Sequence, residues 1–135
     1  MSQLPIPDVG PKYPQDLLAA FGTDLTTGTS KSVAVACLGS ARIRAHIKTA
    51  TVGGTLSLHF ARHVGTDATV VGASGGIDVT KLTQYGAGNP SDVTVTAGSE
   101  AVIDSDCHGE AYAVITLTYT AGAGGAVSLL DVMQV

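Results

Sequence analysis

Apolar and polar residues alternate one by one along several short stretches of the chain. The clearest is 41–48, where every second residue is apolar and the residues between them are Arg42, Arg44, His46 and Lys48. Successive side chains of a β-strand point to opposite faces, so this period of two predicts a half-buried strand with one apolar and one basic face. Similar alternation predicts further strands over 32–38, 55–64 and 110–120.

Shorter stretches of β-type sequence are separated by Gly-rich turns, and they lie at 67–72, 77–82, 92–97, 101–104 and 126–135. About seven to nine short strands, spaced roughly 8–12 residues apart, are typical of an all-β sandwich or barrel. We therefore predict an all-β fold, a jelly-roll-like or Greek-key β-sandwich. An immunoglobulin-like sandwich is the alternative, although the chain has no Trp to supply that fold's hallmark.

The strand over 41–48 is predicted to form a hairpin with the stretch 55–64. A two-residue turn at Gly53 and Gly54 would place Ile47 opposite Phe60 on the apolar side. The same register would gather the basic side chains on the polar face of the hairpin. These are Arg42, Arg44, His46, Lys48, His59 and His63.

The first 22 residues have a different character. Four of the five prolines lie within residues 1–16, and proline is excluded from helix interiors and from central strands. We predict an extended, Pro-rich N-terminal arm over 1–22 and a β-sandwich domain over 23–135. Apolar residues in such an arm would contact a neighbouring surface. The candidates are Leu4, Ile6, Pro7, Val9 and Tyr13.

Charge is sparse and unevenly distributed. Charged residues make up 13% of the chain, and the formal net charge is −4. No acidic residue lies between Asp24 and Asp67, whereas 67–135 holds Lys81 as its only Lys or Arg. So low a charge is unusual for a freely soluble monomer and suggests that other molecules cover much of the surface.

The basic face of the predicted hairpin has three interpretations. It packs against acidic loops of a second copy or of another protein, it is an ordinary solvated sheet face, or it binds nucleic acid. We favour the first, because complementary charge fixes partner choice and register. Nucleic acid is disfavoured because no aromatic residue is interleaved with the basic ones and no nucleic-acid motif is present. The predicted partner-binding residues of the hairpin are Arg42, Arg44, His46 and Lys48.

Candidate chemistry is weak along the whole chain. The densest group of potential ligands is 104–110, but it lacks the spacing of a calcium loop, and acidic residues are common in solvated turns. Cys37 and Cys107 match no metal or redox spacing, so we expect two reduced cysteines, with a disulfide left open. We predict no catalytic residue, no metal and no cofactor, and hence no enzyme. No secretory signal or membrane helix is expected either.

The arm sequence LPIPDVGPKYP, the closing EAYAVITLTYTAGAGGAVSLLDVMQV and the Ala/Gly/Thr/Val-rich composition together resemble one class of proteins. These are the small β-sandwich virion proteins of tailed bacteriophages, in particular capsid decoration (cement) proteins. The resemblance covers most of the chain but rests on overall character rather than on a specific motif.

The resemblance implies a jelly-roll-like body that forms homotrimers on the capsid exterior, after synthesis in the host cytoplasm. Its partner would be the major capsid protein, with no nucleic acid, membrane or cofactor involved and no catalytic residue to carry over. Two alternatives are a glycan-binding β-sandwich module, for which Tyr85 is the aromatic residue to watch, and a tail or fibre-base protein.

Overall fold

The computed structural model describes most of the predicted β-body and little of the N-terminal region. The described residues are 15–16, 25, 28–37, 41–51, 53–63, 79, 82–85, 88–120 and 127–134. Of these, 15–16, 63, 84–85 and 127–134 are described by their backbone alone. The described residues form β-strands and turns with no α-helix, so the all-β prediction is confirmed.

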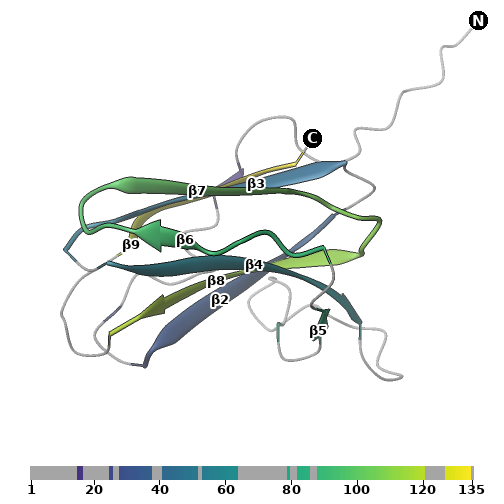
Figure 1. Ribbon diagram of the computed structural model, residues 1–135, viewed down its shortest axis with the longest axis horizontal. Coiled ribbons are helices and arrows are strands. Elements are labelled where there is room, and N and C mark those ends of the chain that lie inside the picture. The colour runs from purple at the N-terminus through teal and green to yellow at the C-terminus, as the bar shows by residue number, and fades with distance from the viewer. Residues whose placement is uncertain are drawn as a thin grey trace, which may run out of the picture.

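The strands form two antiparallel sheets, which lie one above the other in Figure 1. The first sheet has the order β1 (Gln15–Asp16), β9 (Val127–Gln134), β3 (Arg42–Thr49) and β7 (Glu100–Asp106). The second has the order β2 (Ser30–Ala36), β8 (Tyr112–Tyr119) and β4 (Gly54–His63), followed by β5 (Leu82–Tyr85) and β6 (Val93–Val95), both paired with β4. Successive strands therefore alternate between the sheets, except where β4 is followed by β5 and β6.

The last two strands of the second sheet share one side of β4. β5 pairs with the end of β4, where Tyr85 is opposite Phe60, and β6 pairs with its beginning, where Val93 is opposite Leu56. Between them, the Asn89 side-chain oxygen accepts a hydrogen bond from the Phe60 amide at 3.0 Å. β5 and β6 thus occupy the place of one interrupted strand.

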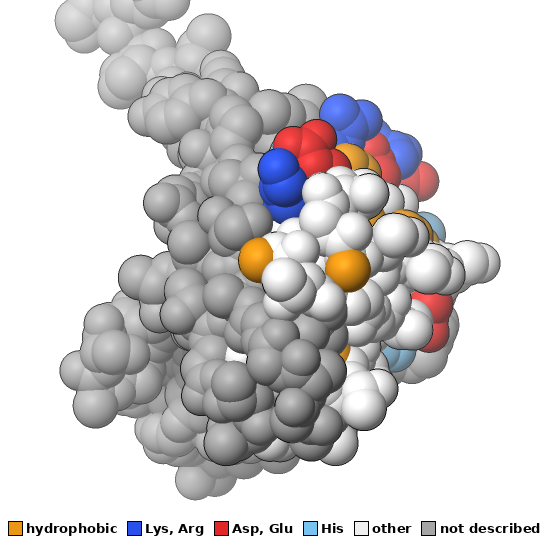
Figure 2. All heavy atoms as spheres, turned by 90° about the vertical axis from the view of Figure 1, so that its left-hand side faces the viewer, with side chains coloured by type: hydrophobic (Ala, Val, Ile, Leu, Met, Phe, Trp, Pro, Cys, Tyr) orange, Lys and Arg blue, Asp and Glu red, His pale blue; other side chains and the backbone are white. Residues whose placement is uncertain are grey.

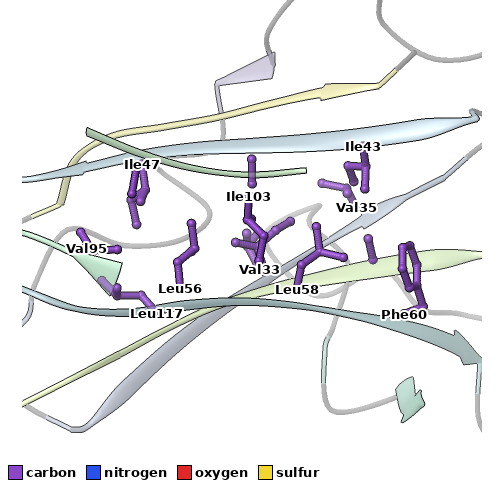
Figure 3. Close-up of a cluster of buried hydrophobic side chains, with 14 of the residues drawn as sticks. Val33, Val35, Ile43, Ile47, Leu56, Leu58, Phe60, Val95, Ile103 and Leu117 are labelled. Atoms are coloured by element: carbon purple, nitrogen blue, oxygen red, sulfur yellow. The ribbon is translucent and has the colours of Figure 1, made fainter. Parts of the chain in front are cut away.

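The hydrophobic core lies between the two sheets. Ile43, Ala45 and Ile47 of β3 have no exposed surface, and the labelled side chains of both sheets point toward one another in Figure 3. The alternation predicted for this strand is confirmed. The core is built from small and medium side chains, and Phe60 is its largest fully buried member.

A second, smaller apolar cluster covers part of the outer face of the second sheet. It contains Ala34, Ala61 and Val114, against which Val79, Leu82 and Tyr112 pack. Part of this sheet is therefore covered by apolar side chains on both of its faces.

The predicted hairpin between 41–48 and 55–64 is wrong. β3 pairs with β7 and β9, whereas β4 pairs with β8, β5 and β6 in the other sheet. Neither Gly53 nor Gly54 has the positive φ of a tight hairpin turn. A Cβ atom at Gly53 would lie 2.7 Å from the Val95 carbonyl oxygen, and one at Gly54 would collide with the Thr118 carbonyl oxygen. The glycines are needed because the chain passes close to neighbouring backbone as it crosses between the sheets.

Several predicted boundaries change or cannot be compared. β7 runs to Asp106, two residues beyond the predicted 101–104 strand. Within the predicted arm, Gln15–Asp16 pairs with β9 as β1. The rest of the arm and the predicted strand over 67–72 lie outside the described residues.

Candidate functional site

The outer face of the first sheet carries the basic row that the sequence predicts on β3. Arg42 and Arg44 are exposed, and His46 and Lys48 are half-buried, while the residues between them belong to the core. The strand takes this form because its apolar positions have a period of two and the core covers only one face.

The neighbouring strand β7 supplies an acidic row in matching register. Asp106 lies opposite Arg42, Asp104 opposite Arg44, and Glu100 opposite Lys48. Directly opposite residues of an antiparallel pair share a face, so the two rows form a ladder of opposite charges on one surface. We call these residues the charge ladder: Arg42, Arg44, His46, Lys48, Glu100, Asp104 and Asp106.

The arginines make the closest contacts of the charge ladder. Arg42 donates through Nη2 to Asp104 Oδ1 at 2.6 Å and through Nη1 to Asp106 Oδ1 at 2.5 Å. Arg44 donates through Nε to Asp104 Oδ2 at 3.0 Å, and its Nη2 lies 2.9 Å from the same oxygen. Asp104 therefore accepts from both arginines, with one carboxylate oxygen for each.

Opposing effects act on the pKa of Asp104. Desolvation at the sheet surface acts to raise it, but hydrogen bonds from Arg42 and Arg44 and their positive charges outweigh this effect and lower it below its ordinary value. In return, the hydrogen bond and charge of Asp104 raise the pKa of Arg42. Both groups are ionised at neutral pH.

The other half of the charge ladder is looser. His46 Nε2 lies 3.4 Å from Glu100 Oε2, a pair that is ionic only when the imidazole is protonated. Val102 lies between the acidic residues of β7 and, with 45% of its surface exposed, is the most open large hydrophobic residue among those described. In Figure 2 the charged side chains gather mainly at the top, over the first sheet, while much of the remaining described surface is white.

Solvent exposure limits the stability that the charge ladder supplies. The side chains of Arg42 and Arg44 are 50% and 58% exposed, and ion pairs on such surfaces contribute little to stability. Their main effect is to favour one pairing register, since a shift of two residues would place Arg44 or Lys48 opposite the uncharged Val102.

The partner of the basic row therefore differs from the sequence interpretation. We expected its acidic partner on another molecule, but β7 of the same chain supplies it. The predicted cluster with His59 and His63 does not form, because both residues belong to β4 in the other sheet. The role of Arg42, Arg44, His46 and Lys48 in binding a partner stays a prediction.

Sequence reasoning predicted a strand over 101–104 but missed its pairing with 41–48, although a signal for this pairing exists. The sequence positions of Glu100, Asp104 and Asp106 differ by even numbers, as do those of the basic residues of β3. Opposite charges with the same period on two stretches indicate neighbouring strands. Proximity in sequence favoured the hairpin instead.

The sequence also predicted partner-binding residues in the N-terminal arm. These residues lie outside the described part of the chain: Leu4, Ile6, Pro7, Val9 and Tyr13.

The tyrosines offer little exposed aromatic surface where their side chains are described. Tyr119 is buried and Tyr112 is half-buried in the second apolar cluster. Tyr85, expected in a Gly-rich loop, is the last residue of β5, and its backbone alone is described.

The two cysteines and the potential metal ligands were the remaining candidates for chemistry. Cys37 and Cys107 are free thiols buried in the core. In the described part of the chain, no three His, Cys, Asp or Glu side chains are arranged to hold a metal ion.

Comparisons with known families and with curated proteins identified no homologue: no known family matches the sequence, and no significant match occurs among curated proteins. Within the described ranges, no helix has the length and hydropathy needed to cross a membrane.

Proposed function

We propose that this chain is a non-enzymatic virion structural protein: a capsid decoration protein with a jelly-roll β-sandwich body that binds and stabilises the head shell of a tailed phage. The observation that carries the proposal is the order of the strands in the two sheets. Counting β5 and β6 as one interrupted strand, each sheet has four strand positions. Jelly rolls have two such layers and are common in viral capsid proteins.

The positions of the last strands within the two sheets also support a jelly-roll topology. The first sheet places the last strand, β9, between β1 and β3, and the second places β8 between β2 and β4. Strands from the end of the chain are thus inserted between strands from its beginning in both layers. This interleaving is what two Greek keys wrapped together produce.

The charge distribution suits a protein packed among many copies. The net charge is −4, and Arg42 and Arg44 are neutralised by β7 of their own chain. A surface with paired charges can approach a shell without burying unpaired ions, which would be costly. Many copies, each making a modest contact, would then bind through avidity.

Two parts of the chain would make the contact. The apolar arm would lie along the shell through Leu4, Ile6, Pro7, Val9 and Tyr13. The charge ladder would add polar contacts, since Arg42 and Arg44 retain exposed N–H groups beyond those that bind Asp104 and Asp106.

Binding to heads of the phage that encodes the chain tests the proposal. The full chain should sediment with purified heads, and its mass in solution should be that of a homotrimer. A chain that sediments with isolated tails but not with heads would replace the proposal with a tail or fibre-base role. A chain that binds neither would contradict a virion role.

A charge exchange separates the two possible roles of the charge ladder. Replacing Arg42 and Arg44 with Asp should destabilise the fold and abolish head binding. Adding Asp104→Arg and Asp106→Arg restores opposite charges in the same register, so thermal stability should recover.

The charge-exchanged chain then gives the decisive comparison. If the arginines contact the shell, it folds but binds heads at least tenfold more weakly than the wild type. If it binds equally well, the charge ladder only holds β3 and β7 together, and the shell contact must lie elsewhere.

A further inference from the structure

The two cysteines meet at one end of the core, although they are far apart in sequence. Cys37 directly follows β2 of the second sheet and Cys107 directly follows β7 of the first. Each is only 1% exposed, and both belong to the core cluster between the sheets.

Backbone hydrogen bonds fix the positions of both residues. The Cys37 amide donates to the Ala111 carbonyl oxygen at 2.8 Å, and the Cys107 amide donates to the Ala41 carbonyl oxygen at 2.8 Å. The turn that follows Cys107 is closed by a third bond, from the Glu110 amide to the Cys107 carbonyl oxygen at 3.0 Å. Cys37 therefore lies beside Ala111, the residue that directly follows this turn, and the two buried thiols are close enough to act on each other's pKa.

We propose that Cys37 and Cys107 form a dithiol–disulfide site that reacts with low-molecular-weight disulfides such as oxidised glutathione and, once closed, ties the two sheets together. The proposal rests on the contact between the thiols and on their origin in different sheets. It does not depend on shell binding.

The surroundings assign an order to the two thiols. Burial, the neighbouring Cys107 thiol and the Glu110 carboxylate raise the pKa of Cys37 to about 12, which makes it the poorer nucleophile. Burial also raises the pKa of Cys107, and so does the Asp106 carboxylate, whereas Cys37 and the charge of Arg42 act in the opposite direction. Cys107 is also the thiol that adjoins the exposed turn at His108 and Gly109, so it attacks first and Cys37 completes the exchange.

The exchange balances in two steps. The Cys107 thiolate attacks one sulfur of oxidised glutathione, whose S–S bond breaks, and the leaving glutathione thiolate takes up the proton that Cys107 released. The Cys37 thiolate then attacks the Cys107 sulfur of the mixed disulfide, and the second glutathione leaves with the proton from Cys37. Two protein thiols are oxidised and one glutathione disulfide is reduced to two thiols.

Access to the buried sulfurs requires the turn after β7 to open. His108 and Gly109 in this turn both have positive φ, at 53° and 70°. His108 is exposed, and its ring contacts Phe60 edge-on with 5.5 Å between the centroids. Opening this short turn would expose Cys107 without separating the strands of the second sheet.

The closed form should be the more stable form. A disulfide that closes a long loop restricts the unfolded chain, so the midpoint of thermal unfolding should rise by about 10 °C. Reduction with dithiothreitol should return the midpoint to its original value.

Refolding in a glutathione redox buffer provides the test. Both thiols are accessible to glutathione while the chain is unfolded, so slow access to the buried thiols of the folded protein cannot prevent the disulfide from forming. The reduced, full-length chain is refolded, remaining thiols are alkylated, and the intact mass and peptide map are measured. The expected product has lost two hydrogen atoms, carries no glutathione and yields a Cys37–Cys107 linked peptide. The single variants Cys37→Ala and Cys107→Ala are the matched controls, and neither should show the rise in unfolding midpoint.

The order of attack is tested with the same variants. Cys37→Ala, which keeps Cys107, should accumulate mixed disulfide with glutathione in the folded state faster than Cys107→Ala does. Two alkylated thiols in the refolded wild type, or a mixed disulfide at Cys107 that Cys37 fails to displace, would overturn the proposal.

Discussion

At the scale of single residues, burial follows the alternation of the sequence closely. Ile43 and Ile47 are fully buried, whereas Arg44 between them is exposed. The difference arises because adjacent strand residues face opposite sides and only one side meets the other sheet. The few residues that break this rule are therefore informative.

Thr49 is the clearest exception, because it is a polar residue with no exposed surface. Its Oγ1 has no hydrogen-bond partner within the described part of the chain. A buried hydroxyl without a partner reduces stability, so Thr49→Val, which keeps the shape, should raise the free energy of unfolding by about 1 kcal/mol. Chemical denaturation measures this change.

Thr118→Val is the control for this substitution. Thr118 is exposed on β8, so its replacement should change stability by less than about 0.5 kcal/mol. A loss of stability in Thr49→Val would mean that the hydroxyl donates to a group elsewhere in the chain.

Asp104 gives an expectation for acid stability. Its pKa is lowered in the folded protein, so its charged form stabilises the fold above the ordinary carboxyl pKa, and this contribution is lost as the pH falls through the lowered value. Stability should therefore decline below about pH 4. Asp104→Asn should flatten that decline in unfolding experiments at several pH values.

Asp92→Asn provides the comparison for the acid experiment. Asp92 is exposed just before β6, which pairs in the second sheet. If it flattens the acid decline as much as Asp104→Asn does, the arginine contacts of Asp104 are not the cause.

At the scale of elements, the crossing from β3 to β4 decides how the sheets form. Backbone from β6 and β8 approaches Gly53 and Gly54 so closely that neither position has room for a side chain. The chain can therefore leave one sheet and enter the other within a few residues. In sequence the same two glycines resemble a hairpin turn.

Gly54→Ala should destabilise the fold strongly, because its Cβ would collide with the Thr118 carbonyl oxygen and lie 3.2 Å from Leu117 Cδ1. Overpacking typically costs about 1–3 kcal/mol in free energy of unfolding, and a collision with backbone should place Gly54→Ala at the upper end of this range or above it. Denaturant unfolding of the purified variant measures the loss.

Gly109→Ala is the matched comparison. It has open space around its Cβ position but a φ of 70°, so the cost should be about 1–2 kcal/mol from backbone strain alone. Equal losses in the two variants would argue against close approach as the reason for Gly54.

At the scale of the whole molecule, the fold depends on contacts between distant parts of the chain. β1 pairs with β9 and β2 pairs with β8, so the beginning and end of the sequence close both sheets. Each sheet is incomplete until the last strands arrive. Formation of such long-range pairs is slow, and we expect folding in milliseconds to seconds.

Deleting residues 1–14 should separate the proposed arm from the body. The truncated chain begins with β1 and keeps every described strand. Its β-body should therefore retain its far-UV circular dichroism spectrum, and its thermal unfolding midpoint should change by no more than a few degrees. The truncated chain should no longer sediment with heads. A truncated chain that still coats heads would show that Leu4, Ile6, Pro7, Val9 and Tyr13 are dispensable for the contact.

The sequence by itself determined which residues face the core, because that depends on the local two-residue period of a strand. It also determined the all-β class and the basic row of β3. Tertiary structure alone decided which strands are neighbours, since one apolar face can pack in many antiparallel pairings. The choice of β7 over β4 as the partner of β3 rests on the register of Asp104 and Asp106 and on the close backbone approach at Gly54, and both involve residues far apart in sequence.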